Sequence, residues 1–201
     1  MNYKPKDFRR LLGMNGFSDE LLEDHFGLYQ GYVSNTNDLF DKLRALSDEG
    51  AQSAEFAELK RRLGWEFNGM RLHELYFSNL GGDGRSPRGL VAGSLERDFG
   101  SFEAWASEFR AVGAMRGVGW TILYHDPMAD RLMNLWIDEH ATYHAAGCTP
   151  LLVMDVWEHA FANDYGTDRK SYIHAFMQNV DWSTVEARLT ANATASAVAT
   201  R

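Results

Sequence analysis

The segment PLLVMDVWEHAF occupies residues 150–161 and joins an apolar run to two side chains that can bind metal. The run over residues 150–156 is apolar almost throughout, which predicts a buried β-strand. Asp155 and His159 stand four residues apart at its end, so that a carboxylate and an imidazole can converge on one point. Desolvating a carboxylate there is costly unless it is paired or bound to metal. The alternative is an aspartate that caps the following helix.

The chain just before this segment has the alternation of paired strands. Residues 118–124 are predicted to form a strand, residues 126–130 a turn, and residues 132–138 the partner strand. Together with residues 150–156, these segments predict a three-stranded antiparallel sheet in the second half of the chain.

The first half has helical periodicity instead. Apolar side chains recur every three or four residues from 21 to 39 and again from 56 to 80. Ser18 is a suitable N-cap for the first helix, and the pair Gly81-Gly82 is a strong stop signal for the second. Two long helices with a short connection predict an antiparallel helical hairpin.

The sequence therefore predicts an α+β fold, in which an N-terminal helical hairpin is followed by an α/β half with a three-stranded antiparallel sheet. We expect a hairpin domain over residues 1–82 and an α+β domain over residues 90–189, joined by a glycine-rich linker. Ser183 and Glu186 are expected to form a capping box that opens the last helix. Residues 190–201 have no apolar period and are predicted to be a disordered tail.

Composition narrows the classes of partner. The chain has 201 residues, 45% of them hydrophobic, and a formal net charge of -8. The length suits a globular protein with a sizeable core, and the acidic balance argues against nucleic acid or an anionic membrane as a partner. Cys148 is the only cysteine, which excludes an intramolecular disulfide and a multi-cysteine metal site. With no apolar run fit for a signal peptide or a membrane span, we expect a cytoplasmic protein.

Two histidines lie within the apolar stripes of the predicted hairpin, His25 in the first helix and His73 in the second. A single histidine on an apolar face is more often a hydrogen-bonded core residue than a ligand, but two on the arms of one hairpin can meet. With Asp155 and His159 they make three imidazoles and one carboxylate. That donor set suits iron, manganese or zinc.

The segment DVWEHAF at residues 155–161 also resembles the signature D-x-W-E-H-A of the iron/manganese superoxide dismutases. Other segments resemble that family in the same order along the chain. They are HFGLYQGYVSNTN at residues 25–37, FNGMRLHELYFSNL at 67–80, FGSFEAWASEF at 99–109, GVGWTIL at 117–123 and YIHAFMQNVDW at 172–182. The resemblance covers residues 17–189.

This resemblance implies roles for particular residues. The family's four metal ligands fall on His25, His73, Asp155 and His159. Its other site positions are a pocket tyrosine, two pocket tryptophans, a glutamate that reaches across the dimer to the partner's ligand histidine, and an arginine near the substrate funnel. These positions fall on Tyr32, Trp120, Trp157, Glu158 and Arg169.

One further position is occupied in the family by a glutamine, or in some members by a histidine, that hydrogen-bonds the metal-bound water. A gapless count back from Thr149 places His140 there. Iron-type members bring the glutamine from the second helix, where this chain has Gly69. We therefore expect His140 to be the substitute, with one ring nitrogen toward the bound solvent and the other toward Tyr32 or a neighbour.

Two departures from the family pattern concern the first helix and the entrance. The spacing from His25 to Tyr32 is seven residues instead of eight, and seven residues turn a regular helix about 700°, back to nearly the same face. The longer spacing would need a local bulge, so a more regular helix is expected here. The family's gateway pair is a histidine and a tyrosine, and this chain has Leu28 or Tyr29 for the first and Ala162 for the second.

A third departure concerns the choice of metal. Val153 stands two residues before Asp155, where the manganese type typically has glycine and the iron type threonine. The resemblance implies one iron or manganese ion per chain, with iron slightly preferred.

The implied activity is disproportionation of superoxide, a small anion, to dioxygen and hydrogen peroxide by a homodimer or tetramer. Two alternatives stay open: another mononuclear iron or manganese oxidoreductase, or a metal-binding protein without turnover. The two pocket tryptophans favour a narrow pocket over one that admits an organic substrate. Among the remaining residues, His125, His144 and His174 are interpreted as surface or second-layer residues, and Trp65 as a core residue.

Overall fold

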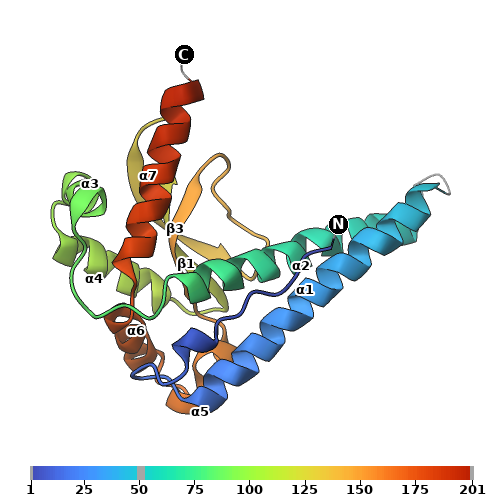
Figure 1. The fold of residues 1–201 in the computed structure, drawn as a ribbon, viewed down its shortest axis with the longest axis horizontal. Helices are drawn as coiled ribbons and strands as arrows, with labels where there is room; N and C mark the ends of the chain where they lie inside the picture. Colours follow the sequence, from blue (N-terminus) through green and yellow to red (C-terminus); the bar gives the residue numbers. More distant parts are fainter. Residues whose placement is uncertain (1, 49–52, 200–201) are drawn as a thin grey trace.

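The computed structural model describes residues 2–48 and 53–199, with side chains up to residue 192. Two long helices are followed by short helices, a sheet and three further helices (Figure 1). In chain order the elements are η1 (Arg9–Leu11), α1 (Asp19–Asp48), α2 (Ala54–Ser78), α3 (Gly89–Phe99), α4 (Phe102–Gly113), β1 (Gly119–Asp126), β2 (Arg131–Asp138), β3 (Thr149–Asp155), η2 (Glu158–Ala160), α5 (Ala162–Tyr165), α6 (Arg169–Gln178) and α7 (Trp182–Ala199). The predicted α+β class is confirmed.

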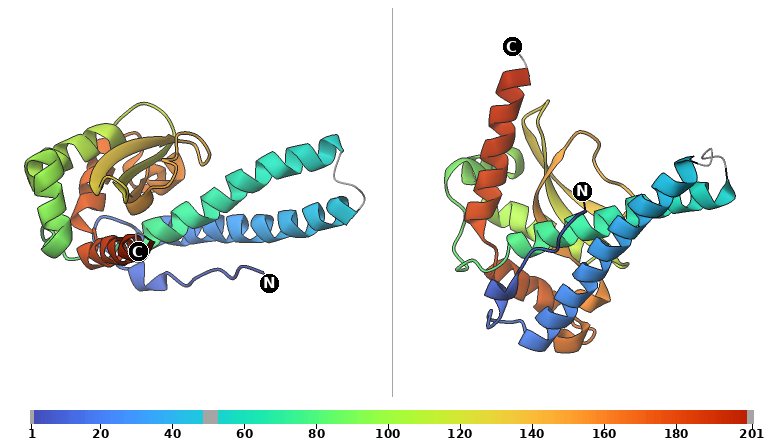
Figure 2. Two further views of the ribbon diagram at one scale, coloured as in Figure 1. Left: turned by 90° about the horizontal axis from the view of Figure 1, so that it is seen from above. Right: turned by 45° about the vertical axis from the view of Figure 1, so that its right-hand side comes forward.

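Helices α1 and α2 form the expected antiparallel hairpin, which extends to one side of the body that carries the sheet (Figure 2). Ser18 begins α1, since its hydroxyl accepts a hydrogen bond from the backbone N–H of Leu21 at 3.1 Å. Ser53 does the same for α2 through the N–H of Phe56 at 3.0 Å. Helix α1 is α-helical throughout, without a bulge between His25 and Tyr32, as the seven-residue spacing predicted.

The sheet has the strand order β2-β1-β3, and both pairings are antiparallel. The observed strands lie within two residues of the predicted ranges at each end. The central strand β1 is buried from Gly119 to His125, because β2 and β3 flank it and α4 packs against it. The register places Trp120 of β1 opposite Asp155 of β3, so the sheet itself positions two of the predicted site residues side by side.

Buried polar contacts join the hairpin to the sheet. The side chain of Asn79, just after α2, accepts from the N–H of Val153 at 2.9 Å and donates to its carbonyl at 3.2 Å. Arg188 of α7 donates to the carbonyls of Leu151 in β3, at 2.6 Å, and Leu75 in α2, at 3.0 Å. These contacts fix the end of β3 against α2, which brings Asp155 to the helix that carries His73.

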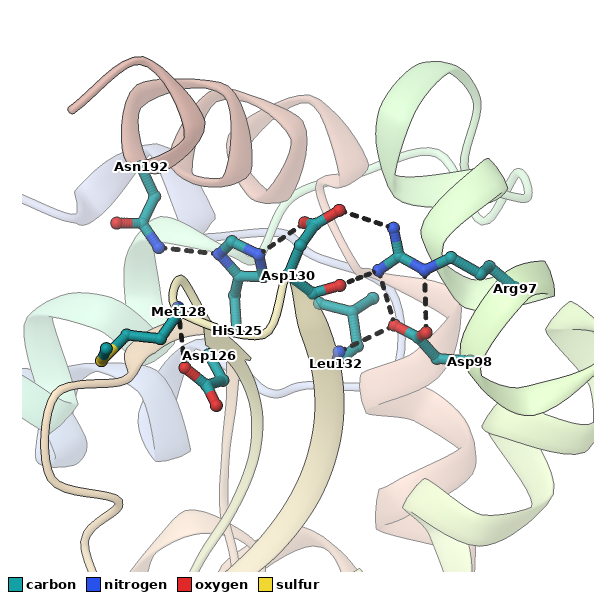
Figure 3. A network of polar contacts seen from close by, with 8 residues as sticks. All are labelled: Arg97, Asp98, His125, Asp126, Met128, Asp130, Leu132 and Asn192. Carbon is teal, nitrogen blue, oxygen red and sulfur yellow. Dashed lines mark hydrogen bonds and ion pairs between the residues drawn. The ribbon is translucent and has the colours of Figure 1, made fainter. Parts of the chain in front are cut away.

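A polar network anchors the β1–β2 turn to the helices around it (Figure 3). His125 is 2% exposed, its Nε2 lies 3.0 Å from Asp130, and Asn192 of α7 lies 2.8 Å from its Nδ1. Arg97 of α3 donates to Asp130 and pairs with its neighbour Asp98, at 2.8 Å in each case. His125 is therefore a buried structural residue rather than a surface one.

The C-terminal helix differs from the prediction. It begins at Trp182 with Asp181 as its capping residue, whose carboxylate accepts from the N–H of Ser183 at 3.0 Å. Glu186 does not form the predicted capping box. It accepts instead from the N–H groups of Leu90, at 2.9 Å, and Val91, at 2.8 Å, and so caps α3.

Helix α7 also extends to Ala199, whereas the sequence predicted disorder from residue 190. Alanine-rich sequence favours helix even without an apolar stripe, which explains the difference. Residues 200 and 201 lie outside the described residues. Within the described ranges, no helix is long and apolar enough to cross a membrane.

Candidate metal centre

Four side chains from four different elements meet between the hairpin and the sheet. Their ligand atoms all lie within 4.8 Å of one another. They come from the first third of α1, the second half of α2, the end of β3 and η2, and we call them the ligand cluster: His25, His73, Asp155 and His159. The sequence singled out all four, and the structure brings all four together.

Oδ2 of Asp155 is the point on which the imidazoles converge. It lies 3.3 Å from Nε2 of His25, 3.6 Å from Nε2 of His73 and 3.2 Å from Nε2 of His159. The other carboxylate oxygen accepts from the backbone N–H of Trp157 at 2.8 Å, which fixes the orientation of the carboxylate. Nδ1 of His73 donates to the carbonyl of Gly69 at 2.6 Å, which leaves its Nε2 lone pair directed toward Asp155.

The protonation states suit a cation. Burial lowers the pKa of His25 and, more strongly, that of His73, so both imidazoles are neutral at pH 7. Burial alone would raise the pKa of Asp155, but the neighbouring His159 and His25 hold it well below its usual range. Nε2 of His25 and Nε2 of His73 are buried and form no hydrogen bond. Unpaired buried lone pairs beside a carboxylate fit a bound iron, manganese or zinc ion.

Aromatic rings enclose the ligand cluster. Tyr32 stacks on His73 with ring centroids 5.2 Å apart, and Trp120 contacts the same imidazole edge-on at 5.0 Å. Trp157 stacks on His159 at 5.8 Å. All three pocket aromatics predicted from the sequence therefore line the site.

Tyr32, His140 and Trp120 form a hydrogen-bonded chain beside the cluster. The Tyr32 hydroxyl lies 2.7 Å from Nε2 of His140, and the indole N–H of Trp120 donates to Nδ1 of His140 at 3.0 Å. Because an indole N–H can only donate, Nδ1 carries no proton, and Nε2–H donates to the tyrosine oxygen. Burial lowers the pKa of His140 to about 4 and raises that of Tyr32 to about 12, so both are neutral at pH 7.

This arrangement differs from the expectation for His140 in one respect. The contact with Tyr32 is present, but Trp120 occupies the ring nitrogen that was expected to face the metal-bound solvent. With both nitrogens of His140 engaged within the protein, its influence on the ligand cluster passes through the Tyr32 hydroxyl.

The turn that carries His140 is held by residues that the sequence did not single out for the site. The carbonyl of His140 accepts from Asn68 of α2 at 2.8 Å and lies 3.0 Å from Nε2 of His144. The Tyr124 hydroxyl in turn lies 2.9 Å from Nδ1 of His144. Trp65, interpreted as a core residue, is half-buried, and its ring contacts that of His140 at 4.9 Å. No local pattern distinguishes Asn68 or Trp65 from other residues of an amphipathic helix.

Gly69 has a steric role in the site. A Cβ atom at this position would lie 2.6 Å from Cδ1 and 2.7 Å from Cε1 of Tyr32, far inside van der Waals contact. The Tyr32 ring therefore occupies the space that a side chain at residue 69 would need. A glutamine from α2 is incompatible with this position of Tyr32, which is a physical reason for a histidine from the turn after β2.

Burial distinguishes the two residues that the sequence offered for the gateway histidine position, Leu28 and Tyr29. Tyr29 is 1% exposed, and its hydroxyl donates to the buried Glu74 at 3.0 Å. Leu28 is 37% exposed and Ala162 is also exposed. Tyr29 thus points into the core of the hairpin, and Leu28 is the surface residue of the two.

Arg169 and Glu158 do not contact the ligand cluster within the chain. The Arg169 guanidinium donates to the carbonyls of Met115 and Gly117, at 2.8 Å each, and lies 5.3 Å from the centroid of the Phe161 ring. Glu158 is exposed, and no hydrogen bond or ion pair engages its carboxylate in the described part of the chain. Its neighbour His159 is the most exposed of the ligands, with 27% of its side chain accessible.

Comparison with known proteins agrees with this geometry. Residues 87–188 match the model of the C-terminal domain of iron/manganese superoxide dismutases. The chain is 39% identical over 181 residues to an iron superoxide dismutase of Cupriavidus metallidurans, covering 89% of this chain and 91% of the relative. It is 36% identical to an iron superoxide dismutase of Aquifex pyrophilus, over 92% and 90% of the two chains. A manganese superoxide dismutase of Haloferax volcanii is 35% identical, over 85% and 86%.

Proposed function

The chain belongs to the iron/manganese superoxide dismutase family, and from this premise we propose that its ligand cluster holds one redox-active iron or manganese ion. The protein is an oxidoreductase that converts two superoxide anions and two protons into one dioxygen and one hydrogen peroxide. The observation that carries the assignment is the convergence of three imidazoles on one buried carboxylate.

When bound, the ion would supply a one-electron couple between the +2 and +3 states, which zinc lacks. His25, His73 and His159 would bind it through Nε2, and Asp155 would contribute the one negative charge of the ligand set. Asp155 is itself oriented by the N–H of Trp157. A fixed second contact of this kind tunes both the basicity of the carboxylate and the metal potential.

In our proposal the proton donor is the Tyr32 hydroxyl, and the chain Trp120–His140–Tyr32 positions it; the Trp120 indole keeps its proton and only fixes the His140 ring. Since the Tyr32 oxygen accepts the Nε2–H of His140, the Tyr32 O–H is left to donate toward the substrate side. A pKa of about 12 keeps this hydroxyl protonated across the physiological range. His140 with a pKa of about 4 stays neutral, so it holds the tyrosine without adding a charge.

We propose iron as the resident metal. Three relatives with 36–39% identity, from Cupriavidus metallidurans, Aquifex pyrophilus and Pyrobaculum aerophilum, are named as iron enzymes, which supports this choice. At 34–35% identity the relatives include both an iron enzyme and manganese enzymes. Elemental analysis of protein purified from its native cell, combined with activity per metal ion, tests the assignment.

We also propose that the protein works as a homodimer or a tetramer of such dimers in the cytoplasm. The exposed carboxylate of Glu158 adjoins the partly exposed ligand His159, an arrangement that a second copy of the chain can complete. A single cysteine, Cys148, is consistent with a reducing compartment.

The decisive experiment is rapid-mixing measurement of superoxide consumption by protein loaded separately with iron, manganese and zinc. We expect turnover with iron or manganese and none with zinc. Protein that binds iron at one ion per chain without consuming superoxide would instead be a metal-binding protein without this activity. The alternative of another mononuclear iron or manganese oxidoreductase, acting on an organic substrate, is disfavoured because the rings of Trp120 and Trp157 lie against the ligands His73 and His159.

A further inference from the structure

An arginine of α2 lies one aromatic ring away from the proton-delivery chain. The Arg62 guanidinium lies 5.4 Å from the centroid of the Trp65 ring. The Trp65 ring in turn contacts His140 at 4.9 Å and Trp157 at 6.1 Å. Arg62 therefore adjoins the same side of the site as Tyr32 and His140, outside the aromatic layer.

A buried carboxylate holds Arg62 in this orientation. Nε of Arg62 donates to Glu66 at 2.7 Å, and Glu66 also accepts from Asn35 of α1 at 3.2 Å. The Glu66 side chain is 3% exposed and that of Arg62 is 56% exposed. The pair is thus a fixed dipole with its negative end inside the hairpin and its positive end in solvent. Leaving the buried Glu66 carboxylate unpaired would cost free energy, and this cost keeps the Arg62 guanidinium in place.

The charges of Arg62 and Glu66 act on residues of the site. Burial is the main cause that raises the pKa of Tyr32, Glu66 raises it further, and Arg62 lowers it. Arg62 also lowers the pKa of His140, after the larger effects of burial, Asp155 and His159. At Tyr32 the effect of Glu66 is larger than that of Arg62. Toward solvent the order is reversed, because the Arg62 side chain is 56% exposed and that of Glu66 only 3%, so an anion in solvent meets the guanidinium first.

Arg169, the arginine that the sequence suggested for the substrate funnel, is engaged differently. Both of its terminal nitrogens donate to backbone carbonyls, and its plane faces Phe161. In an acidic chain with a net charge of -8, an anionic substrate needs a local region of positive potential. We propose that Arg62, fixed by Glu66, supplies this potential and draws the substrate anion to the Tyr32–Trp65 side of the site; this inference rests on the proposed function.

The test uses Arg61 as a matched control. Arg61 precedes Arg62 on the same helix and pairs with Glu58, and both of these side chains are largely exposed, at 70% and 74%. Arg61→Gln and Arg62→Gln change the net charge equally, so they separate a local effect from a global one. We expect Arg62→Gln to lower kcat/KM several-fold at low ionic strength, with a smaller loss in salt near 0.15 M, and Arg61→Gln to leave it within twofold.

The double variant Arg62→Gln/Glu66→Gln removes the cation without leaving an unpaired buried carboxylate. We expect it to keep the fold, by circular dichroism and thermal unfolding, and to retain the reduced kcat/KM. Recovery of the wild-type rate in the double variant would show that the defect of Arg62→Gln came from the exposed charge of Glu66, and would overturn the proposal.

A measurement independent of turnover completes the design, namely the association rate of azide, a small inorganic anion, with metal-loaded protein. We expect Arg62→Gln to slow azide association and Arg61→Gln to leave it unchanged. An inactive wild type with this azide pattern would refute the proposed function while supporting anion attraction by Arg62. Equal superoxide and azide rates in the two single variants, with equal salt dependence, would refute the inference about Arg62 alone.

Discussion

The hydroxyl of Tyr32 lies 2.7 Å from Nε2 of His140, although 108 residues separate the two in sequence. Tyr32 belongs to the helical hairpin, and His140 follows β2 of the sheet. The contact therefore exists only when the two halves of the chain are docked. A proton path that depends on it is sensitive to any change that separates the hairpin from the sheet.

Replacement of His140 tests this path. His140→Ala removes the donor to Tyr32 and the acceptor for Trp120, so we expect turnover to fall at least tenfold with the metal retained. The upper limit is the loss of the proton donor itself, which typically contributes about 10²–10⁴-fold. His140→Gln can still donate from its amide and should keep more of the rate. Turnover, metal content and the visible spectrum of the loaded protein are the measurements. An unchanged rate together with an unchanged spectrum in His140→Ala would mean that His140 has no role in the reaction.

Substitution at Gly69 should disturb the contact between Tyr32 and His140 by displacing Tyr32. A methyl group at this position would clash with the Tyr32 ring, so Gly69→Ala should displace the ring, weaken its bond to His140, and destabilise the protein by about 1–3 kcal/mol. Gly64→Ala on the same helix is the control, since a Cβ atom there would meet no neighbouring group within 4 Å, and it should stabilise by about 0.5–1 kcal/mol. The measurements are the free energy of unfolding in urea and the turnover of both variants. Equal effects would show that Tyr32 can move at no cost.

Asp155 is the anionic member of the ligand cluster. Asp155→Ala should abolish turnover and weaken metal retention, because the site loses its one negative charge and the point on which the imidazoles converge. Asp155→Asn keeps the shape without the charge and should also lose metal. Metal content after dialysis against a chelator is the measurement, with circular dichroism as the check on folding. Full activity of Asp155→Ala would place the site elsewhere.

Metal-free protein should lose stability on mild acidification. His140 has a pKa of about 4 when folded and 6.5 when unfolded, so between these values the unfolded chain binds a proton that the folded chain does not. The free energy of unfolding therefore falls as the pH drops from 6.5 to 4, by at most about 3 kcal/mol for this residue. His25 and His73 act in the same direction.

Urea unfolding at pH 7 and pH 5 measures this effect. His140→Gln should reduce the difference between the two pH values. The control is His174→Gln, since His174 is exposed on α6 and should leave the difference as in the wild type. Identical pH dependence in wild type and His140→Gln would show that His140 is protonated equally in the folded and unfolded chains.

Glu158 tests the proposed assembly. Glu158→Ala should weaken self-association and, because the partner's carboxylate is proposed to reach His159, also weaken metal retention. Glu96→Ala, which removes an exposed carboxylate from α3, should do neither. Sedimentation at several protein concentrations and metal analysis measure both effects together. A wild type that is monomeric and fully active would contradict the proposal.

The sequence alone determined the α+β class, the hairpin and the strands, because helical and alternating periods record which side of each element is buried. It also indicated the ligand cluster, because His25 and His73 interrupt apolar stripes and Asp155 ends an apolar strand. The roles of these residues as ligands stay a prediction until a metal is measured.

Only the tertiary structure decided the details that depend on contacts between distant elements. In the folded chain, Nδ1 of His140 accepts a hydrogen bond from Trp120, and Glu186 caps α3 instead of its own helix. The Tyr32 ring occupies the space beside Gly69. The tertiary structure also engages Arg169 with backbone carbonyls while directing Arg62 into solvent beside Trp65. The periodicity of apolar residues indicates which face of a helix or strand is buried, but not which residue a side chain on that face contacts. The partner of a polar side chain is set by packing between elements, where hydrogen-bond geometry and steric exclusion operate over a few ångströms.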